Sequence, residues 1–433
     1  MKRAFSFSRP RHLFSLLLSL LAATSPAIAQ APASSFGGDL WTRPKLTGDW
    51  GGVRDQWAAK GFTIDLDTVY TLQGVASGGL PGTSNDLGNT VNNNLVFSLD
   101  TGKAGFWPGG FLKLRLENRA GDSVIGKAGS LSPVDSAVLF PSSTGNADKS
   151  VFGLTELTYM QFFSPKFGVI GGLINGLDAD DNAIAGDLRR NETFFNASFL
   201  ASLVEIANAP NASLGGGVIF LPTPSVTGEL LAFGTEETAT RNPFDNWNGT
   251  TIATQWTFKH SLANAPGGQT VGFLDSIGRT RTDIFQDPRI FLRNLVAARS
   301  VPTANKNSWA LYYNAYQYIA GDERGGWGPF LRAGLSDGDP NPVKWNIAAG
   351  LGGRGTFAGR DGDRWGIGFY HLGMSDKGLL GAADIGDESG GELFYNVALT
   401  PAVHATLDSQ WVSSGRPRQQ TAWVLGARLQ LGF

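Results

Sequence analysis

Apolar and polar residues alternate with a period of two along most of the chain after Phe62. The segment 112–117 reads LKLRLE, and the segments 393–400, 403–411 and 423–433 show the same alternation. This period places apolar side chains on one face of a β-strand and polar side chains on the other. The sequence therefore predicts an all-β protein whose strands each have one apolar face.

Two architectures fit strands of this kind. In a soluble sandwich the apolar face packs in the core, whereas in a membrane barrel it contacts lipid and the polar face lines the lumen. The strands here run for about 9–13 residues, enough to cross a bilayer at a tilt, while sandwich strands average about 5–6 residues. Short Gly/Pro turns alternate with longer polar loops, as in outer-membrane barrels. We therefore predict a transmembrane antiparallel β-barrel.

The alternation indicates about sixteen strands, an even number as in single-chain bacterial barrels. They are expected to start near residues 62, 92, 110, 151, 166, 214, 227, 250, 269, 308, 326, 346, 363, 391, 402 and 421. Barrels of about 16–18 strands enclose an aqueous channel. The longest stretch without a strand pattern spans 176–213. Because loops of this length usually have a function, we expect it to fold inward and form a constriction.

Helical periodicity is limited to one short segment between residues 50 and 60. Asp49 is the expected N-cap of this helix and Gly61 its expected C-cap. Arg54 and Trp57 lie one turn apart on one of its faces. We expect the helix to pack at the periplasmic mouth of the barrel.

Residues 1–29 have the pattern of a secretory signal peptide. Basic residues precede a short apolar run at 13–23, and a small-x-small cleavage site follows at 27–29. The apolar run is shorter than the ~20 residues that a membrane-spanning helix needs. We therefore expect a cleaved signal peptide, a periplasmic segment with the short helix at 30–61, and a barrel domain at 62–433. The expected location is the outer membrane of a Gram-negative bacterium.

Composition narrows the possible chemistry. The chain contains no Cys, which excludes disulfides, Cys-ligated zinc, iron–sulfur clusters and thiol nucleophiles. Charged residues make up only 17% of the chain and the formal net charge is −2. This balance argues against nucleic acid as the main partner, and no cofactor is expected.

Motifs of enzymes and metal sites occur only in contexts that do not support them. The G-x-S-x-G at 334–338 lacks the strand-to-helix turn of a nucleophile elbow, and the G-x-G-x-x-G at 350–355 lies within an expected strand. The run from Asp178 opens like a calcium loop, but Ala183 replaces the turn glycine and Arg189 the bidentate acid. An ordinary acidic loop fits better, with one bound calcium as the open alternative. No enzymatic activity is expected.

Strand parity directs charged residues of both signs toward one face, the expected lumen wall. These residues are Asp65, Asp67, Lys113, Arg115, Glu117, Arg332, Arg354, Glu392, Asp408 and Arg428. Such charges supply donors and acceptors for a polyhydroxylated solute, and Trp247, Tyr312 and Tyr316 are candidates for stacking on sugar faces. The alternative is that the charges only pair with one another to satisfy a polar interior.

Several segments match a known family. The segment 46–54 reads LTGDWGGVR, 154–161 reads LTELTYMQ, and 336–342 reads SDGDPNP. Further matching positions are Gly61, Gly350, Gly355, Arg360, Asp363, Glu392, Tyr395, 399–401, Asp408, Gln410, Gly426, Arg428 and Phe433. In these features the chain resembles the carbohydrate-selective (OprB-type) porins of Gram-negative outer membranes. A departure is SGRP at 414–417, where the family pattern has an Asn-Pro-Gly turn.

The resemblance implies a porin through which small sugars diffuse passively into the periplasm. The long loop supplies the candidates for the constriction: Asp187, Arg189, Arg190 and Glu192. The strands supply candidate residues of the wall beside it: Arg115, Glu117, Arg332, Arg354 and Arg428. Neutralising Arg115 or Arg189 is expected to change conductance and ion selectivity while the barrel still folds.

Two other functions stay open at this point. A general or differently selective diffusion porin shares every feature of the barrel, and a plugged barrel would act as a surface binding protein or an enzyme. The expected partners are outer-membrane lipid, small sugars as permeating solutes, and the barrel assembly machinery, which recognises a terminal aromatic residue such as Phe433. Both a monomer and a trimer fit the sequence.

Overall fold

The structure is a computed structural model that describes residues 36–142, 150–178, 180–245, 247–282, 289 and 303–433. The expected signal peptide at 1–29 lies outside the described residues. The periplasmic segment expected at 30–61 is described from Phe36 onward.

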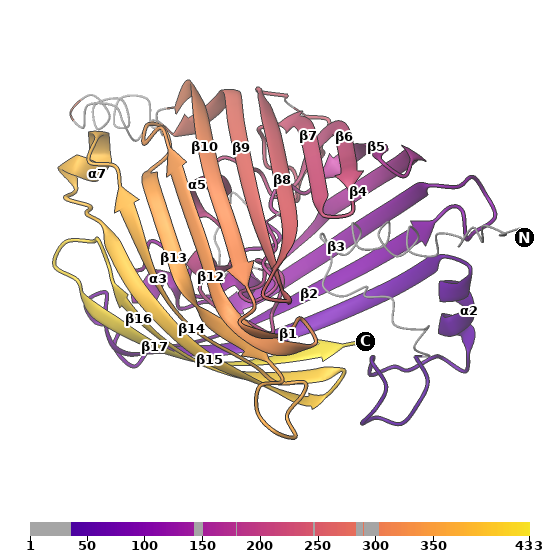
Figure 1. The fold of residues 1–433 in the computed structure, drawn as a ribbon. Helices are drawn as coiled ribbons and strands as arrows, with labels where there is room; N and C mark the ends of the chain where they lie inside the picture. The colour runs from indigo at the N-terminus through magenta and orange to yellow at the C-terminus, as the bar shows by residue number, and fades with distance from the viewer. Residues whose placement is uncertain (1–35, 143–149, 179, 246, 283–288, 290–302) are drawn as a thin grey trace, which may run out of the picture.

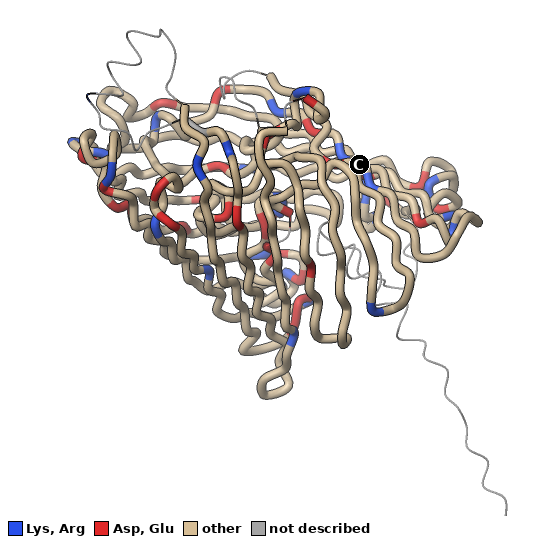
Figure 2. The backbone as a smooth tube through the Cα atoms, turned by 90° about the horizontal axis from the view of Figure 1, so that it is seen from above, with Lys and Arg blue, Asp and Glu red and all other residues tan. Residues whose placement is uncertain are grey.

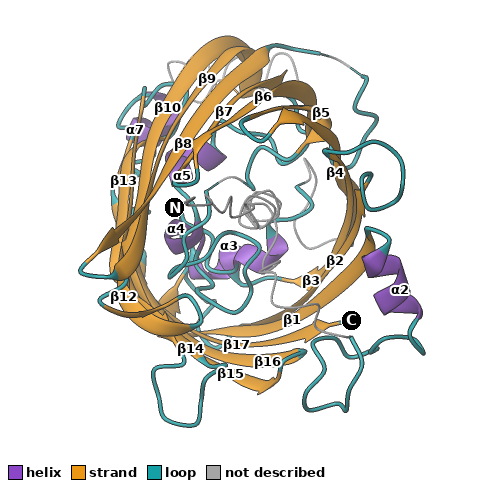
Figure 3. Cartoon of the chain, turned by 45° about the vertical axis from the view of Figure 1, so that its right-hand side comes forward, coloured by secondary structure: helices purple, strands orange, loops and turns teal. Residues whose placement is uncertain are grey.

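Long antiparallel strands form one closed sheet around a central space (Figures 1 and 3). Their bounds are β1 (Phe62–Gly79), β2 (Leu87–Asp100), β3 (Gly110–Asp122), β4 (Val151–Ser164), β5 (Phe167–Ile174), β6 (Ser213–Thr223), β7 (Val226–Gly234), β8 (Thr250–Leu262), β9 (Ala265–Thr282), β10 (Thr303–Gln317), β11 (Ala320–Asp322), β12 (Gly325–Ser336), β13 (Val343–Arg354), β14 (Arg364–Met374), β15 (Glu388–Thr400), β16 (Val403–Ser413) and β17 (Gln420–Gly432). The first strand pairs with the last, from Asp67 opposite Gly432 to Gly79 opposite Gln420. This pairing closes the barrel and leaves neither strand with a free edge.

The expected number of strands is confirmed. The three-residue β11 follows β10 and pairs with the same neighbour, β12, so the two form one interrupted wall strand. Within the described residues the barrel therefore has 16 wall strands. Most strands start close to the expected positions; β2 and β10 begin somewhat earlier, at Leu87 and Thr303.

Alternation along each strand separates a lipid-facing surface from the lumen. On β17, Leu425 is 52% exposed on the outside, whereas Arg428 on the opposite face is 2% exposed. Leu393 and Leu407 are likewise exposed on the outer face. Long stretches of the strands carry no charged residue (Figure 2). Exposed leucines outside and buried charges inside invert the pattern of a soluble sandwich and match a barrel surrounded by lipid.

The two ends of the barrel differ in the length of their connections. At the end where β1 begins, adjacent strands are joined by short turns such as 165–166, 224–225 and 263–264. The opposite end carries longer connections, among them 175–212 and 235–249. In outer-membrane barrels the short turns lie in the periplasm and the longer loops outside, so β1 begins at the periplasmic end.

The short helix α2 (Val53–Ala59) is present but begins later than expected. Gly52 is its N-cap, in a left-handed conformation with a φ of 89°. Asp49 instead accepts a hydrogen bond from the backbone N–H two residues on, so its predicted role as the N-cap was wrong. The left-handed backbone before Val53 cannot belong to a right-handed helix, which explains the later start. The C-cap is Lys60 rather than Gly61, which follows it.

Two of the long loops enter the barrel (Figure 3). We call 175–212 the constriction loop and 123–142 the companion loop. Their short helices, and one in the loop between β14 and β15, are α3 (Ile125–Ala128), the 3-10 helix η1 (Ser136–Val138), α4 (Ala197–Leu200), α5 (Leu203–Ile206) and α7 (Gly378–Ala382). Every residue from 193 to 205 is buried, which confirms that the long loop folds inward. No helix of the described residues is both long and apolar enough to span a membrane.

Candidate constriction inside the barrel

Arg332 on β12 holds the constriction loop against the wall. Its side chain is fully buried, and its Nη1 donates a hydrogen bond to the carboxylate of Asp180. Its other N–H groups donate to the backbone oxygens of Phe199 (2.9 Å), Gly186 (2.7 Å) and Asp180 (2.9 Å). The planar fork of donors in arginine suits several acceptors at once. One wall side chain therefore fixes three separate points of the loop.

A second group of charges joins the constriction loop to β3 and β4. Arg115 donates to Asp178 over 2.5 Å, and Arg189 donates both to Asp178, over 2.5 Å, and to Glu117. Arg115 also lies 3.7 Å from Glu156. Burial alone raises the pKa of Asp178, but Arg115 and Arg189 outweigh it and lower this pKa well below its usual value. Positive and negative groups alternate through the cluster, which offsets the cost of burying them.

The middle of the constriction loop contacts β14 and β16 through Glu192. Glu192 accepts a hydrogen bond of 3.0 Å from Arg364 and lies 3.9 Å from His404. Burial raises the pKa of Glu192, but Arg364, His404 and Arg190 outweigh burial and bring the pKa from 4.5 to about 2. Glu192 therefore contributes to loop docking as a carboxylate.

Acidification is expected to weaken the docking of the constriction loop at Glu192 in a defined pH window. Because docked Glu192 has a lower pKa than the 4.5 of the released side chain, its contribution is complete above pH 4.5 and is lost as the pH falls toward about 2. We expect single-channel current in planar bilayers to be steady above pH 4.5 and to become noisier below it. In Glu192→Gln the noise should already be present at neutral pH, and an identical pH response of both proteins would contradict the assignment.

Asp187 organises the loop backbone locally. Its Oδ1 accepts hydrogen bonds from the backbone N–H groups of Arg189 (2.7 Å) and Arg190 (3.0 Å). Arg190 in turn pairs with Asp181 over 3.1 Å. These local bonds orient the two consecutive arginines, so that Arg189 reaches Glu117 on the wall while Arg190 stays with its own loop.

Arg428 on β17 and Glu392 on β15 anchor the two inner loops together. Arg428 donates to Asp135 of the companion loop over 3.1 Å, and its guanidinium lies 3.6 Å from the ring centroid of Phe195 in the constriction loop. Glu392 accepts hydrogen bonds from the backbone N–H groups of Phe195 (2.6 Å) and Asn196 (2.9 Å). A charge-assisted bond such as that between Arg428 and Asp135 is stronger than a neutral one. The wall charges therefore also position loop backbone.

The apolar side of the constriction loop packs against β14 and β15. Phe194 stacks on Phe199 with ring centroids 4.6 Å apart and meets Phe394 edge-on at 4.7 Å. Gly366 and Gly368 on β14 leave room for these rings, because a Cβ at Gly368 would lie 2.5 Å from a ring atom of Phe199. The wall is thus recessed where the aromatic side of the loop rests on it.

A small polar cavity, which we call the polar slot, separates the constriction loop from β2 and β3. Its volume is about 10 Å³, which is enough for one water. Its lining residues are Asn92, Asn94, Glu117, Ser136, Ala137, Phe140, Leu188, Arg189 and Asn191. Among the described residues, some of its buried polar atoms have no hydrogen-bond partner: Asn94 Oδ1, Glu117 Oε2, Arg189 Nη2 and Asn191 Oδ1. The slot therefore offers both acceptors and a donor to whatever occupies it.

Comparison with known families decides what kind of barrel this is. Residues 84–433 match the model of the OprB family of carbohydrate-selective porins. The chain belongs to the OprB family. Among curated proteins, none matches the chain at a significant level.

Solved structures support the same fold for this OprB-family chain. The high-pH structure of Pseudomonas putida OprB has a TM-score of 0.76 and 20% identity, over 92% of this chain and 100% of that one. Its low-pH structure has a TM-score of 0.56 and 18% identity, over 91% and 99%. Salmonella typhi OmpF, in complex with daunomycin, has a TM-score of 0.53 and 10% identity, over 86% and 98%. At these identities the likeness shows the barrel fold.

Most residues predicted for the site lie inside this OprB-family barrel, where their partners are other side chains and loop backbone. Loop-to-wall contacts involve Arg115, Glu117, Arg189, Glu192, Arg332 and Arg428. Asp187 and Arg190 make contacts within the constriction loop. Arg354 on β13 lies opposite Arg364 of β14, the residue that donates to Glu192, and the Nε of Arg354 is buried without a hydrogen-bond partner among the described residues.

The acids at 178–181 have a role that the sequence did not reveal. They diverge toward different arginines, Asp178 to Arg115 and Asp180 to Arg332. Within the described ranges, no group of three or more His, Asp and Glu side chains is placed to hold a metal. Parity placed Arg332 and Arg428 on strands that carry no acid, but it did not identify their partners in the loops.

The three aromatic residues proposed for sugar stacking do not meet at the polar slot. Trp247 is exposed on the loop between β7 and β8. Tyr312 is buried, with its hydroxyl bonded to Gln255 on β8, and Tyr316 packs edge-on against Tyr318. The aromatic ring that does line the slot is Phe140 of the companion loop.

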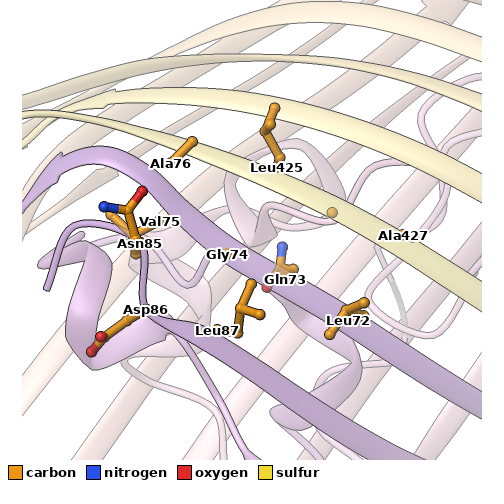
Figure 4. Close-up of a pocket in the computed structure, with 11 residues that line it drawn as sticks. Leu72, Gln73, Gly74, Val75, Ala76, Asn85, Asp86, Leu87, Leu425 and Ala427 are labelled. Atoms are coloured by element: carbon orange, nitrogen blue, oxygen red, sulfur yellow. The ribbon is translucent and has the colours of Figure 1, made fainter.

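An apolar groove of about 420 Å³ lies on the outside of the wall along β1 and β17 (Figure 4). Leu72, Leu87 and Leu425 border it, and the small residues Gly74 and Ala427 lie between them. All three leucines are exposed on the lipid-facing surface. The groove is therefore separate from the solute path through the lumen.

Proposed function

We propose that this OprB-family porin lets small neutral sugars diffuse passively across the outer membrane into the periplasm, past the constriction loop. The observation that carries the proposal is the polar slot, where Glu117 and Arg189 leave an unused acceptor beside an unused donor. A sugar hydroxyl both donates and accepts hydrogen bonds. A hydroxyl is therefore suited to bind to this acceptor and this donor as a sugar passes.

The charge arrangement favours neutral solutes. Arg115, Asp178, Arg189 and Glu117 neutralise one another within hydrogen-bond distance. An ion passing this cluster meets no single-sign field to hold it, whereas a hydroxyl meets oriented donors and acceptors. A channel must also bind weakly enough to release its solute, and a millimolar affinity corresponds to only about 4 kcal/mol. No bond is made or broken in this proposal, so the protein is a channel and not an enzyme.

Liposome swelling with purified protein tests the proposed selectivity. We expect rapid swelling with monosaccharides and clearly slower swelling with amino acids of similar size. Asn94→Leu removes an acceptor of the slot and should slow sugar entry several-fold. Asn93→Leu is the matched control, because Asn93 lies on the outer face, hydrogen-bonded to Thr68.

Equal swelling rates for all small solutes would replace the proposal with a general diffusion porin. An absence of swelling from a folded barrel would mean a plugged lumen. If Asn94→Leu and Asn93→Leu behaved alike, the polar slot would lie off the solute path.

Charge variants at the slot are expected to shift ion selectivity in opposite directions. Arg189→Gln removes the positive charge that pairs with Asp178 and Glu117. The negative charge at the slot is then less compensated, so the reversal potential in a salt gradient should move toward cation selectivity. Glu117→Gln should move it toward anion selectivity by freeing the charge of Arg189. Single-channel recordings in planar bilayers measure both shifts, and unchanged potentials in both variants would remove this pair from the ion path.

We also infer how the protein reaches and contacts its membrane. Residues 1–29 direct export and are cleaved, residues 30–61 lie on the periplasmic side, and residues 62–433 form the barrel domain. The exposed leucines of β15 to β17 support direct contact with outer-membrane lipid. The C-terminal strand β17, which Phe433 follows, is the segment offered to the barrel assembly machinery. Light scattering of the purified protein distinguishes a monomer from a trimer.

A further inference from the structure

The segment before the barrel exposes several large apolar side chains. Trp41 is 70% exposed, and Leu40, Trp50, Val53 and Trp57 are each exposed by more than a third of their surface. In a helix, Val53 and Trp57 are one turn apart and share a face, so α2 has an apolar side that stays partly exposed. Side chains of this kind normally pack against protein or lie at a membrane.

The contacts of α2 place this apolar face on the lipid side of the barrel rim. The ring of Trp57 meets the ring of Phe62, the first residue of β1, with centroids 5.4 Å apart. Phe62 has the same strand parity as Tyr70 and Leu72, which are exposed on the outer surface. Trp50 extends the row, with its ring 5.9 Å from that of Trp57. Figure 3 shows α2 outside the wall, next to the start of β1, which pairs with the end of β2.

Arg54 holds the segment in this position. Its buried guanidinium donates hydrogen bonds to the backbone oxygens of Ile64 (2.7 Å) and Phe433 (3.1 Å) and to Asp65 (3.1 Å). The backbone N–H of Leu46 also donates to the oxygen of Gly432 over 2.7 Å. The segment is thus bound to the seam between β1 and β17, and the aromatic row is presented by a fixed element.

The row continues the aromatic belt at the periplasmic end of the wall. On the neighbouring hairpins, Trp107 lies 6.5 Å from Tyr159, and Phe163 stacks on Phe167 at 6.4 Å. Phe163 and Trp107 are both exposed. Outer-membrane barrels carry aromatic girdles at both membrane interfaces, because Trp and Tyr prefer the level of the lipid headgroups.

We propose that the segment 36–60 is an interfacial anchor whose Trp41, Val53 and Trp57 side chains insert into the headgroup region of the periplasmic phospholipid leaflet. The occupant is phospholipid because the apolar face is continuous with the lipid-facing surface through Phe62. Acidic and basic residues are nearly balanced in this segment, so insertion relies on apolar burial and zwitterionic lipid suffices. The anchor braces the seam of the barrel at the membrane surface, a role separate from solute passage.

Site-directed spin labelling tests the anchor, and the lack of native Cys makes each label unique. Val53→Cys places a nitroxide on the apolar side of α2, Trp41→Cys places one at the most exposed tryptophan of the segment, and Ala59→Cys places one on the exposed opposite side of α2. In full-length protein reconstituted into phosphatidylcholine bilayers, power saturation compares collisions with oxygen and with a water-soluble nickel complex. We expect oxygen collisions to dominate at Val53 and Trp41 and nickel collisions to dominate at Ala59.

Two outcomes would overturn the anchor. Dominant nickel collisions at Val53 and Trp41 would show that the face lies in water. Protection from both reagents, increasing with the protein-to-lipid ratio, would show that a second copy of the chain covers it. The result is independent of sugar passage, since swelling rates of the same labelled proteins report the channel separately.

Discussion

Arg332→Ala is expected to raise the single-channel conductance several-fold and to reduce discrimination between solutes. The substitution removes the donors to Asp180, Phe199 and Gly186 and leaves the Asp180 carboxylate buried without its charge partner. Breaking a buried ion pair from one side costs about 3–5 kcal/mol. The constriction loop should therefore leave the wall for a large fraction of the time. Recordings in planar bilayers measure the conductance directly.

A matched control separates this effect from general loss of arginine. Arg324 lies in the periplasmic turn before β12 and is 94% exposed, so Arg324→Ala should conduct like the wild type. The heat-dependent gel mobility of both variants should still report a folded barrel, because the β12 pairings are backbone hydrogen bonds. Wild-type conductance in Arg332→Ala would show that the loop is held by other contacts.

Phe199→Ala is expected to have the largest effect on the packing of the constriction loop. Removing a fully buried Phe side chain costs about 3–5 kcal/mol through lost burial and the cavity left behind. The cavity here would lie between Phe194 and the recess at Gly368, neither of which can move to fill it without loosening the loop. We expect faster cleavage of the loop by protease in proteoliposomes and a lower unfolding temperature.

The control for this substitution uses a ring on the outer surface. Phe163 is 69% exposed on the outer wall, so Phe163→Ala removes the same atoms without opening an internal cavity. It should leave the protease sensitivity of the constriction loop unchanged. Equal cleavage rates in the two variants would contradict a packed aromatic core beneath the loop.

The barrel was predictable because the sequence of each strand shows which of its side chains face lipid and which face the lumen. In the segment LKLRLE at 112–117, the leucines face outward and Lys113, Arg115 and Glu117 are buried inside. The period of two is local, so it survives in the sequence whatever the partner strand is. The helix α2 was placed less accurately, because Gly52 adopts a left-handed conformation that glycine permits but that the pattern of apolar residues does not record.

The constriction was only partly predictable. Candidate wall arginines followed from parity, yet their partners are far away in sequence: Arg332 and Asp180 are 152 residues apart, and Arg428 and Asp135 are 293 apart. No local pattern specifies such pairs. The acids from Asp178 onward accordingly looked like a solvated or calcium-binding loop, although they neutralise wall arginines.

The sequence by itself therefore determined the wall: where the strands lie, which face meets lipid and which face is charged. It did so because the contrast between lipid and water acts on each side chain separately. Only the tertiary structure decided how the lumen is filled. The choice of partner for Arg115, Arg332 and Arg428 depends on two loops returning into the same enclosed space, where desolvation makes every unpaired charge costly.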